Sequence, residues 1–351
     1  MDFFARTVLA FLALSAAAQA GELAHLGPLR ADAGEAVSGY LAVPARDDDG
    51  AEIPVSLVRG AAPGPVLALV AGTHGYEYPG ISALQRLRQT IDPRALRGTL
   101  VLVHIANPPS FYGRTIYTSP ADGKNLNRVF PGRPDGSLSE RIAHAITTEV
   151  IAKADYLVDL HAGDGNEALR PYAYMPVTGD ARLDAATRGM ALAFGLDHIV
   201  IDAARVQPGE ATQFVDQTAL ARGVPAITTE TGQLGRNDDH SIALAEHGIR
   251  NLMRHLGMLD GEADTNPGVV WLRDYEVVRS PANGIFRAVV REGYAVARGG
   301  LLGELFDPFG AKTGDVRAPF DGIVNYVIGT PPAVAGQPLA MVSRLAASPP
   351  P

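Results

Sequence analysis

Two potential metal ligands, His74 and Glu77, stand three residues apart directly after an apolar segment. That segment, residues 66–71, is short and continuous, which predicts a buried strand that ends at Gly72. Residues 81–89 then follow a helical pattern. An imidazole and a carboxylate on one loop can bind one face of a divalent cation. Open α/β sheets bind their ligands at the carboxyl ends of strands, so the position of this pair is more informative than its spacing.

Two more residues of the same kind stand at strand ends. His161 and Glu230 are each the last residue of a short apolar segment. A single histidine at such a position is more often solvated or hydrogen-bonded than a ligand, but two histidines and a carboxylate form a common catalytic zinc set. Zinc lowers the pKa of bound water, and a general base must take the proton. We therefore predict His74, Glu77 and His161 as metal ligands and Glu230 as the base.

Strands alternate with helices along most of the chain, which predicts an α/β fold with helices on both faces of a parallel or mixed sheet. Further strands are expected at residues 99–105 and 198–202, and helices at 139–153, 182–194, 211–222 and 240–256. Ser137 followed by Glu140 predicts a capping box at the start of helix 139–153. Residues 53–58 contain Pro54, which favours an edge strand. The long segment 112–134 has no clear pattern, which is typical of a functional loop.

The pattern changes after a polar stretch at residues 260–267. Short β-like runs separated by glycine and proline follow, and two similar segments begin at Ser280 and Arg317, which predicts a small all-β, barrel-like domain. The predicted organisation is a signal peptide (1–20), a catalytic α/β domain (21–262), a C-terminal β module (263–345) and a disordered tail (346–351).

Composition limits the classes of function. The chain of 351 residues has no cysteine, which excludes disulfides, thiolate metal sites and cysteine nucleophiles. Its formal charge of −8 argues against nucleic-acid or anionic-membrane partners. One arginine, an apolar run and Ala18-Gln19-Ala20 predict a cleaved export signal, with an uncleaved anchor as the alternative. We therefore expect a periplasmic or secreted protein.

Several other motifs carry little weight. Gly163-Asp-Gly165 follows a strand like a dinucleotide fingerprint, but Pro171 and nearby aromatics argue against the required helix. A serine nucleophile elbow is absent from the sequence. His240, His247 and His255 lie along one predicted helix, and we expect them to be solvated.

Four segments together resemble the succinylglutamate desuccinylase/aspartoacylase family of the zinc carboxypeptidase-like group. The resemblance covers about residues 66–256, and the segments, in the family's order, are Gly72-Thr-His-Gly-Tyr-Glu77, Asn125-Leu-Asn-Arg128-Val-Phe-Pro-Gly132, Asp159-Leu-His161 and Glu230-Thr-Gly232. It implies a mixed-sheet fold, one zinc ion per chain held by His74, Glu77 and His161, and Glu230 as general base and acid. Gly232 is expected to leave room for substrate.

The resemblance also implies how substrate binds. Asn127 and Arg128 would hold its carboxylate, and the planar fork of arginine suits that role. The alternative is that Arg128 pairs with the nearby Asp122. Arg114 would polarise the scissile carbonyl, although the segment 118–123 places it farther upstream than is usual, and a surface arginine is the alternative.

Together these observations predict a zinc-dependent hydrolase that cleaves an amide bond in an N-acyl amino acid or a short peptide-like substrate. A periplasmic metallocarboxypeptidase or cell-wall peptide amidase is the alternative enzyme, and an exported binding protein is the alternative without catalysis. The C-terminal module resembles biotinyl/lipoyl-type folds but has no lysine at the expected tip. It would shape substrate access or contribute to a homo-oligomer contact.

Overall fold

A computed structural model describes residues 23–203 and 211–347 of the chain. The predicted signal peptide and residues 348–351 of the predicted tail lie outside these ranges, so both stay predictions. No helix within these two ranges has the length and apolar character of a membrane span.

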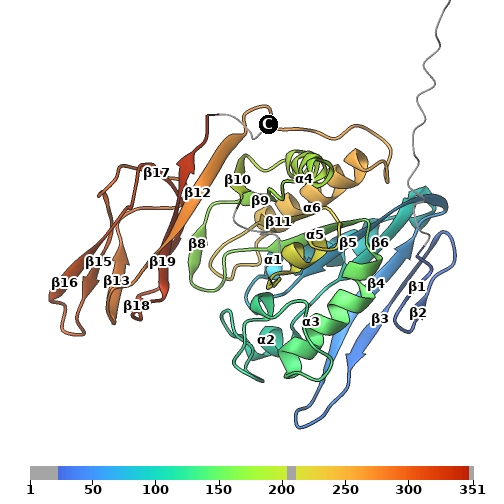
Figure 1. Cartoon of the computed structure of the whole chain (residues 1–351), viewed down its shortest axis with the longest axis horizontal. Helices are drawn as coiled ribbons and strands as arrows, with labels where there is room; N and C mark the ends of the chain where they lie inside the picture. The colour runs from blue at the N-terminus through green and yellow to red at the C-terminus, as the bar shows by residue number, and fades with distance from the viewer. Residues whose placement is uncertain (1–22, 204–210, 348–351) are drawn as a thin grey trace, which may run out of the picture.

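One mixed sheet of thirteen strands runs through the described part of the chain (Figure 1). Its apolar central strands β5 (Ala62–Ala71), β7 (Tyr156–His161) and β11 (Ala226–Glu230) are parallel neighbours. In contrast, β9 (Tyr172–Pro176) is antiparallel to β11, and β4 (Ala51–Arg59) is antiparallel to β6 (Arg97–Val103). The strand order is β14 (Ala295–Val296), β17 (Gly322–Ile328), β19 (Pro338–Leu345), β12 (Val270–Arg279), β10 (His198–Asp202), β9 (Tyr172–Pro176), β11 (Ala226–Glu230), β7 (Tyr156–His161), β5 (Ala62–Ala71), β6 (Arg97–Val103), β4 (Ala51–Arg59) and β3 (Glu35–Val43), with β8 (Glu167–Leu169) on β17. The carboxyl ends of β5, β7 and β11 therefore share one edge.

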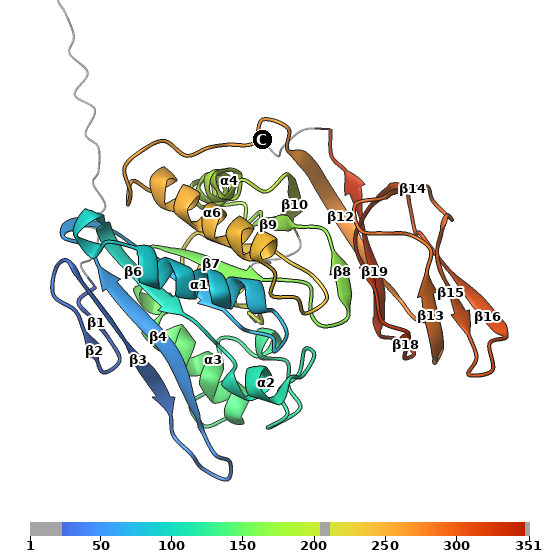
Figure 2. The ribbon, with the colours of Figure 1, turned by 180° about the vertical axis from the view of Figure 1, so that it is seen from behind.

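Helices cover both faces of this sheet, as the alternating pattern predicts. One face packs against α1 (Tyr78–Thr90), α4 (Ala181–Phe194) and α6 (Asp239–His255), which stand in front of the sheet in Figure 2. The other face packs against α3 (Leu138–Glu149) and the short α5 (Val215–Leu220), which stand in front in Figure 1. The backbone N–H of Ser137 donates to Glu140 Oε2 at 2.9 Å, so Glu140 supplies its half of the predicted capping box.

The expectation of an edge strand around Pro54 is wrong. β4 pairs with both β3 and β6, and β3 is the edge strand. Pro54 is tolerated because the pairing of β4 with β6 stops at Val55, so no ladder bond to β6 requires its missing N–H. The neighbouring carbonyl is still used, since the N–H of His104 donates to Pro54 O at 2.9 Å.

The C-terminal strands continue the central sheet. β12 pairs in parallel with β10 and antiparallel with β19, so the sheet runs without a break into the β module. A second sheet packs against this part, in the order β16 (Lys312–Arg317), β15 (Leu301–Phe306), β13 (Gly284–Ala288) and β18 (Pro332–Ala333). The two sheets enclose a common apolar core. The two similar segments lead into β13 and β17, one in each sheet.

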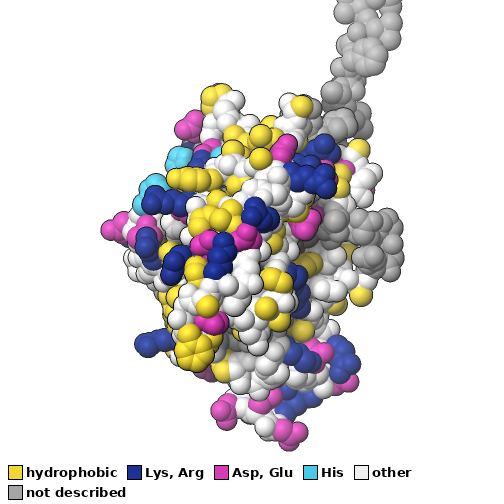
Figure 3. All heavy atoms as spheres, turned by 90° about the vertical axis from the view of Figure 1, so that its left-hand side faces the viewer, with side chains coloured by type: hydrophobic (Ala, Val, Ile, Leu, Met, Phe, Trp, Pro, Cys, Tyr) yellow, Lys and Arg dark blue, Asp and Glu magenta, His cyan; other side chains and the backbone are white. Residues whose placement is uncertain are grey.

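The end of the molecule formed by the β module carries interspersed acidic and basic side chains among hydrophobic ones (Figure 3). At the other end of the chain, β1 (His25–Leu26) and β2 (Leu29–Arg30) form a separate two-stranded sheet.

Candidate active site

The loop between β5 and α1 is held rigidly at the edge of the sheet. Gly72 has φ +70°, a left-handed conformation that glycine adopts without strain, and it turns the chain away from β5. Asn107 then fixes the loop, because its backbone N–H donates to Gly72 O at 3.0 Å and its Nδ2 donates to Thr73 O at 3.2 Å. The loop that carries His74 and Glu77 is thus tied to the residue that caps α2 (Pro108–Gly113).

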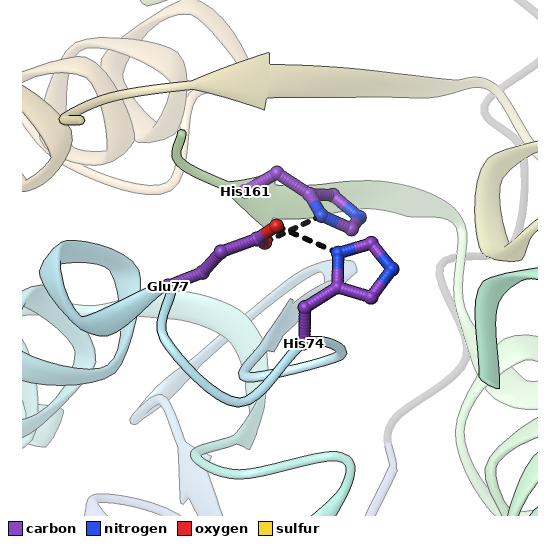
Figure 4. Close-up of side chains that lie close together, drawn as sticks. All are labelled: His74, Glu77 and His161. Carbon is purple, nitrogen blue, oxygen red and sulfur yellow. Dashed lines mark hydrogen bonds and ion pairs between the residues drawn. The ribbon is translucent and has the colours of Figure 1, made fainter. Parts of the chain in front are cut away.

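The three predicted ligands come together in a buried cluster (Figure 4). His74 Nδ1 lies 2.6 Å from Glu77 Oε1, and His161 Nδ1 lies 2.6 Å from Glu77 Oε2. One ligand atom from each residue lies within 4.8 Å of the other two. Two imidazole nitrogens and a carboxylate oxygen are a donor set that fits zinc.

Hydrogen-bond acceptors outside the cluster orient both histidine rings. Asn125 Oδ1 lies 3.1 Å from His74 Nε2, and it also accepts the N–H of Asn127 at 2.8 Å, which identifies it as the oxygen. Asp159 Oδ2 lies 2.9 Å from His161 Nε2. Each acceptor keeps a proton on Nε2 and leaves Nδ1 for a metal ion, which is the usual arrangement around protein-bound metals.

Sequence reasoning did not assign these orienting roles. Asp159 lies two residues before His161 in β7, and side chains at that spacing share a face of a strand, so the motif does contain a signal. Asn125 has no comparable signal, because it lies 51 residues from His74 in the chain.

The cluster is electrostatically coupled without a metal. Burial lowers the pKa of His161, but the carboxylates of Asp159 and Glu77 outweigh it and hold that pKa well above its usual value. Burial likewise opposes protonation of His74, and Glu77 raises its pKa overall. Although burial would raise the pKa of Glu77, the two imidazoles lower it to about 2. Glu77 is therefore held in its charged form beside the two imidazoles.

Glu230 stands next to the cluster, as predicted. It ends β11 opposite His161 of β7 and lines the same pocket. Its Oε2 is buried and has no hydrogen-bond partner among the described residues. Burial raises the pKa of the carboxyl group well above its usual value, partly offset by His161. A buried carboxyl group with a free oxygen and a raised pKa suits proton transfer.

Asn127 and Arg128 also reach the pocket, in different ways. Asn127 is buried, its Oδ1 accepts the N–H of Val215 at 3.0 Å, and its Nδ2 donates toward Asp159 Oδ2 at 3.4 Å. Its amide therefore contacts Asp159, the carboxylate that orients the ring of His161. Arg128 is exposed at the pocket wall, with its guanidinium carbon 4.6 Å from the centre of the Phe214 ring.

Asp122 and Arg114 are not among the residues that line the pocket. Asp122, the alternative partner of Arg128, accepts hydrogen bonds from the backbone and hydroxyl of Ser139 at the start of α3. Arg114 is exposed after α2 with φ 51° and is not among the pocket-lining residues, so the structure does not bring it to the ligands and its role stays a prediction.

Gly232, which was expected to leave room for substrate, packs closely against the start of α1 and is not among the residues that line the pocket. A Cβ atom there would stand 2.7 Å from Pro79 Cγ, at the start of α1, and the residue has φ +123°. His240, His247 and His255 are exposed on α6, as expected.

The pocket of about 250 Å³ above the cluster is closed in part by the C-terminal strands. Tyr275, Val277, Tyr326 and Met341 line it from β12, β17 and β19, together with Tyr172 of β9. The β module therefore builds a wall of the site, a contribution without any local sequence signal. A narrow, tyrosine-rich pocket of this kind suits a small substrate with a few fixed polar groups.

Comparisons with known proteins find relatives that cover most of the chain. A sequence model of the succinylglutamate desuccinylase/aspartoacylase catalytic domain matches residues 63–256. The N-alpha-acetyl-L-2,4-diaminobutyric acid deacetylase of Halomonas elongata is 32% identical over 297 residues, which cover 82% of this chain and 85% of that protein.

Solved structures agree over nearly the whole chain. The product-bound ectoine utilization protein EutE (DoeB) of Ruegeria pomeroyi is 30% identical, with a TM-score of 0.82 over 90% of this chain and 98% of that one. A succinylglutamate desuccinylase from Silicibacter sp. TM1040 is 28% identical, with a TM-score of 0.80 over 91% and 98%. The chain therefore belongs to the succinylglutamate desuccinylase/aspartoacylase family, whose members are amino acid deacylases that act on amide bonds.

Proposed function

We propose that this protein is a zinc-dependent deacylase of N-acyl amino acids, with an acetyl-sized acyl group. The observation that carries the proposal is one pocket in which the buried cluster of His74, Glu77 and His161 meets Glu230, whose Oε2 has no protein partner among the described residues. The similarity to a deacetylase of N-alpha-acetyl-L-2,4-diaminobutyric acid supports the substrate class. The small volume of the pocket favours such a substrate over a cell-wall peptide.

The residues divide the chemistry between them. Zinc held by the two Nδ1 atoms and Glu77 would polarise the scissile carbonyl and the attacking water. Glu230 takes a proton from the attacking water as the water oxygen bonds to the carbonyl carbon. As the C–N bond breaks, Glu230 returns a proton to the departing nitrogen, so that a carboxylic acid and a free amino acid leave. Arg128 at the pocket wall binds the substrate carboxylate.

Metal analysis and hydrolysis assays test the proposal together. Purified protein should contain about one zinc per chain, because one three-ligand cluster is present among the described residues. Glu230→Gln should keep that zinc and lower kcat for N-acetyl amino acids by about 100- to 10,000-fold, the range of general acid–base catalysis. Full activity of metal-free protein, or of the Gln variant, would contradict the mechanism.

We also propose that the protein is exported to the periplasm. The support is the pattern of residues 1–20 and the lack of cysteine in the whole chain. Cell fractionation and N-terminal sequencing of the mature protein would test this, and a cytoplasmic protein that retains Met1 would contradict it.

A further inference from the structure

One wall of the pocket is a row of side chains that crosses four strands. Val277 of β12 lies opposite Met341 of β19, and Met341 lies opposite Tyr326 of β17. Tyr326 in turn lies opposite Leu169 of β8. Residues directly opposite each other in neighbouring strands have their side chains on the same face, so these four form a continuous row. All four line the pocket.

Met341 lies within this row and is held in place by two tyrosines. Its side chain is 1% exposed. The hydroxyl groups of Tyr174 and Tyr172 donate toward its Sδ, at 3.5 Å and 4.0 Å. Tyr172 lies opposite Glu230 in the pairing of β9 with β11. A single tyrosine therefore connects Met341 with the residue that we propose as the general base.

The chemical character of the row suits a hydrocarbon group. Among the described residues that line the pocket, the aliphatic side chains and the methionine all belong to this row. In an N-acyl amino acid, the amino-acid part carries the carboxylate, for which Arg128 is the proposed partner. A short acyl chain has no charged group, and its burial against aliphatic side chains is favourable. The row is therefore the part of the wall that fits the acyl group.

The same row limits the length of that group. The pocket has a volume of about 250 Å³. Protein interiors are close-packed, so each carbon atom added to the acyl chain needs space that a buried side chain already fills. Met341 has the longest side chain of the non-aromatic residues in the row, and its contacts with Tyr172 and Tyr174 oppose its displacement.

We propose that Met341 sets the upper limit on the length of the acyl group. This inference rests on the proposed deacylase function and assigns a residue that selects its acyl group. The alternative is a structural role, in which Met341 only supports Tyr172 and Tyr174. The two roles differ in one respect, because a support depends on the sulfur contacts, whereas a length limit depends on the bulk of the side chain.

The test uses alkyl hydroxamates, because a hydroxamate group binds zinc and its alkyl chain then occupies the position of the acyl group. Acetohydroxamate and butyrohydroxamate are compared by calorimetric titration of the zinc-loaded full-length protein. Wild type should bind acetohydroxamate at least about tenfold more tightly, because one methylene in an apolar pocket changes discrimination about 10- to 200-fold. Met341→Ala opens the row and should bind butyrohydroxamate at least as tightly as acetohydroxamate.

Two further variants separate bulk from contacts. Met341→Leu keeps most of the bulk without the sulfur, so it should retain the wild-type preference. Val277→Ala shortens a neighbouring side chain of the row and should shift the preference toward butyrohydroxamate by a smaller factor. This second variant keeps the test decisive if Met341→Ala does not fold.

Several results would overturn the inference. They are equal or tighter binding of butyrohydroxamate by wild type, no binding of acetohydroxamate, an unchanged preference in Met341→Ala or, where that variant does not fold, in Val277→Ala, or a loss in Met341→Leu as large as in Met341→Ala. Because the assay measures binding, it also separates this inference from the proposed chemistry. A length preference without hydrolysis of any N-acyl amino acid would refute only the deacylase function. Hydrolysis without a length preference would refute only the role of Met341.

Discussion

Replacing Asp159 with asparagine should weaken zinc binding without removing a ligand. Asp159 is 0% exposed, and its Oδ2 lies 2.9 Å from His161 Nε2. The amide has nearly the same shape but no charge, so it holds the Nε2 proton less strongly and makes Nδ1 a poorer donor. Changes to such orienting partners lower metal affinity about 10- to 100-fold, which corresponds to about 1.4 to 2.7 kcal/mol.

Competition for zinc with a chromophoric chelator measures this change directly. Thermal unfolding of the metal-free variant should be recorded first, so that a loss of fold is not taken for a loss of affinity. Glu230→Gln is the matched control, because it neutralises a carboxyl group in the same pocket whose Oε2 has no hydrogen-bond partner among the described residues, and it should bind zinc like wild type. If folded Asp159→Asn binds zinc within about twofold of wild type, the orienting role is refuted.

Two further predictions concern stability. The hydrogen bond from Lys124 at 2.8 Å lowers the pKa of Glu140 from 4.5 to about 2, so Glu140 stabilises the fold above about pH 4.5 and this contribution is lost as the pH falls through 2. Glu140→Gln should therefore cost about 1 to 2 kcal/mol at pH 7 and less at pH 3 in urea unfolding, and an equal cost at both pH values would contradict the assignment. Gly232→Ala should lower the free energy of unfolding by about 1 to 3 kcal/mol, because Gly232 has φ +123° and the added Cβ would clash with Pro79. An unchanged Tm would show that the loop relaxes freely.

The strand ends explain why the residues of the candidate metal site could be predicted to lie together. The apolar segments before His74, His161 and Glu230 mark buried parallel strands, and parallel neighbours present their carboxyl ends at one edge. The apolar strand pattern and the histidine and glutamate side chains at the strand ends therefore point to the same edge of the sheet. The sequence predicts that these residues lie together without knowledge of contacts between distant segments. The capping pair of Ser137 and Glu140 was predictable for the same reason.

Two predictions were wrong because they inferred the surroundings of a residue from its type alone. Gly232 looked like space for substrate, but the chain brings Pro79 of α1 against it. Pro54 looked like an edge signal, but β4 reaches β6 only beyond it. Each outcome depends on which distant element packs nearby, and residue types alone do not encode that.

By itself, the sequence determined the α/β arrangement and the strand-end positions of His74, Glu77, His161 and Glu230, because each follows or ends an apolar strand and β5, β7 and β11 are parallel neighbours. Only the tertiary structure decided the rest of the pocket. Asn125 meets His74 across a loop, Tyr326 arrives from the β module, and Glu167 reaches the wall through the pairing of β8 with β17. These contacts join segments far apart in the chain, so their side chains acquire a common environment only when the sheet closes around them.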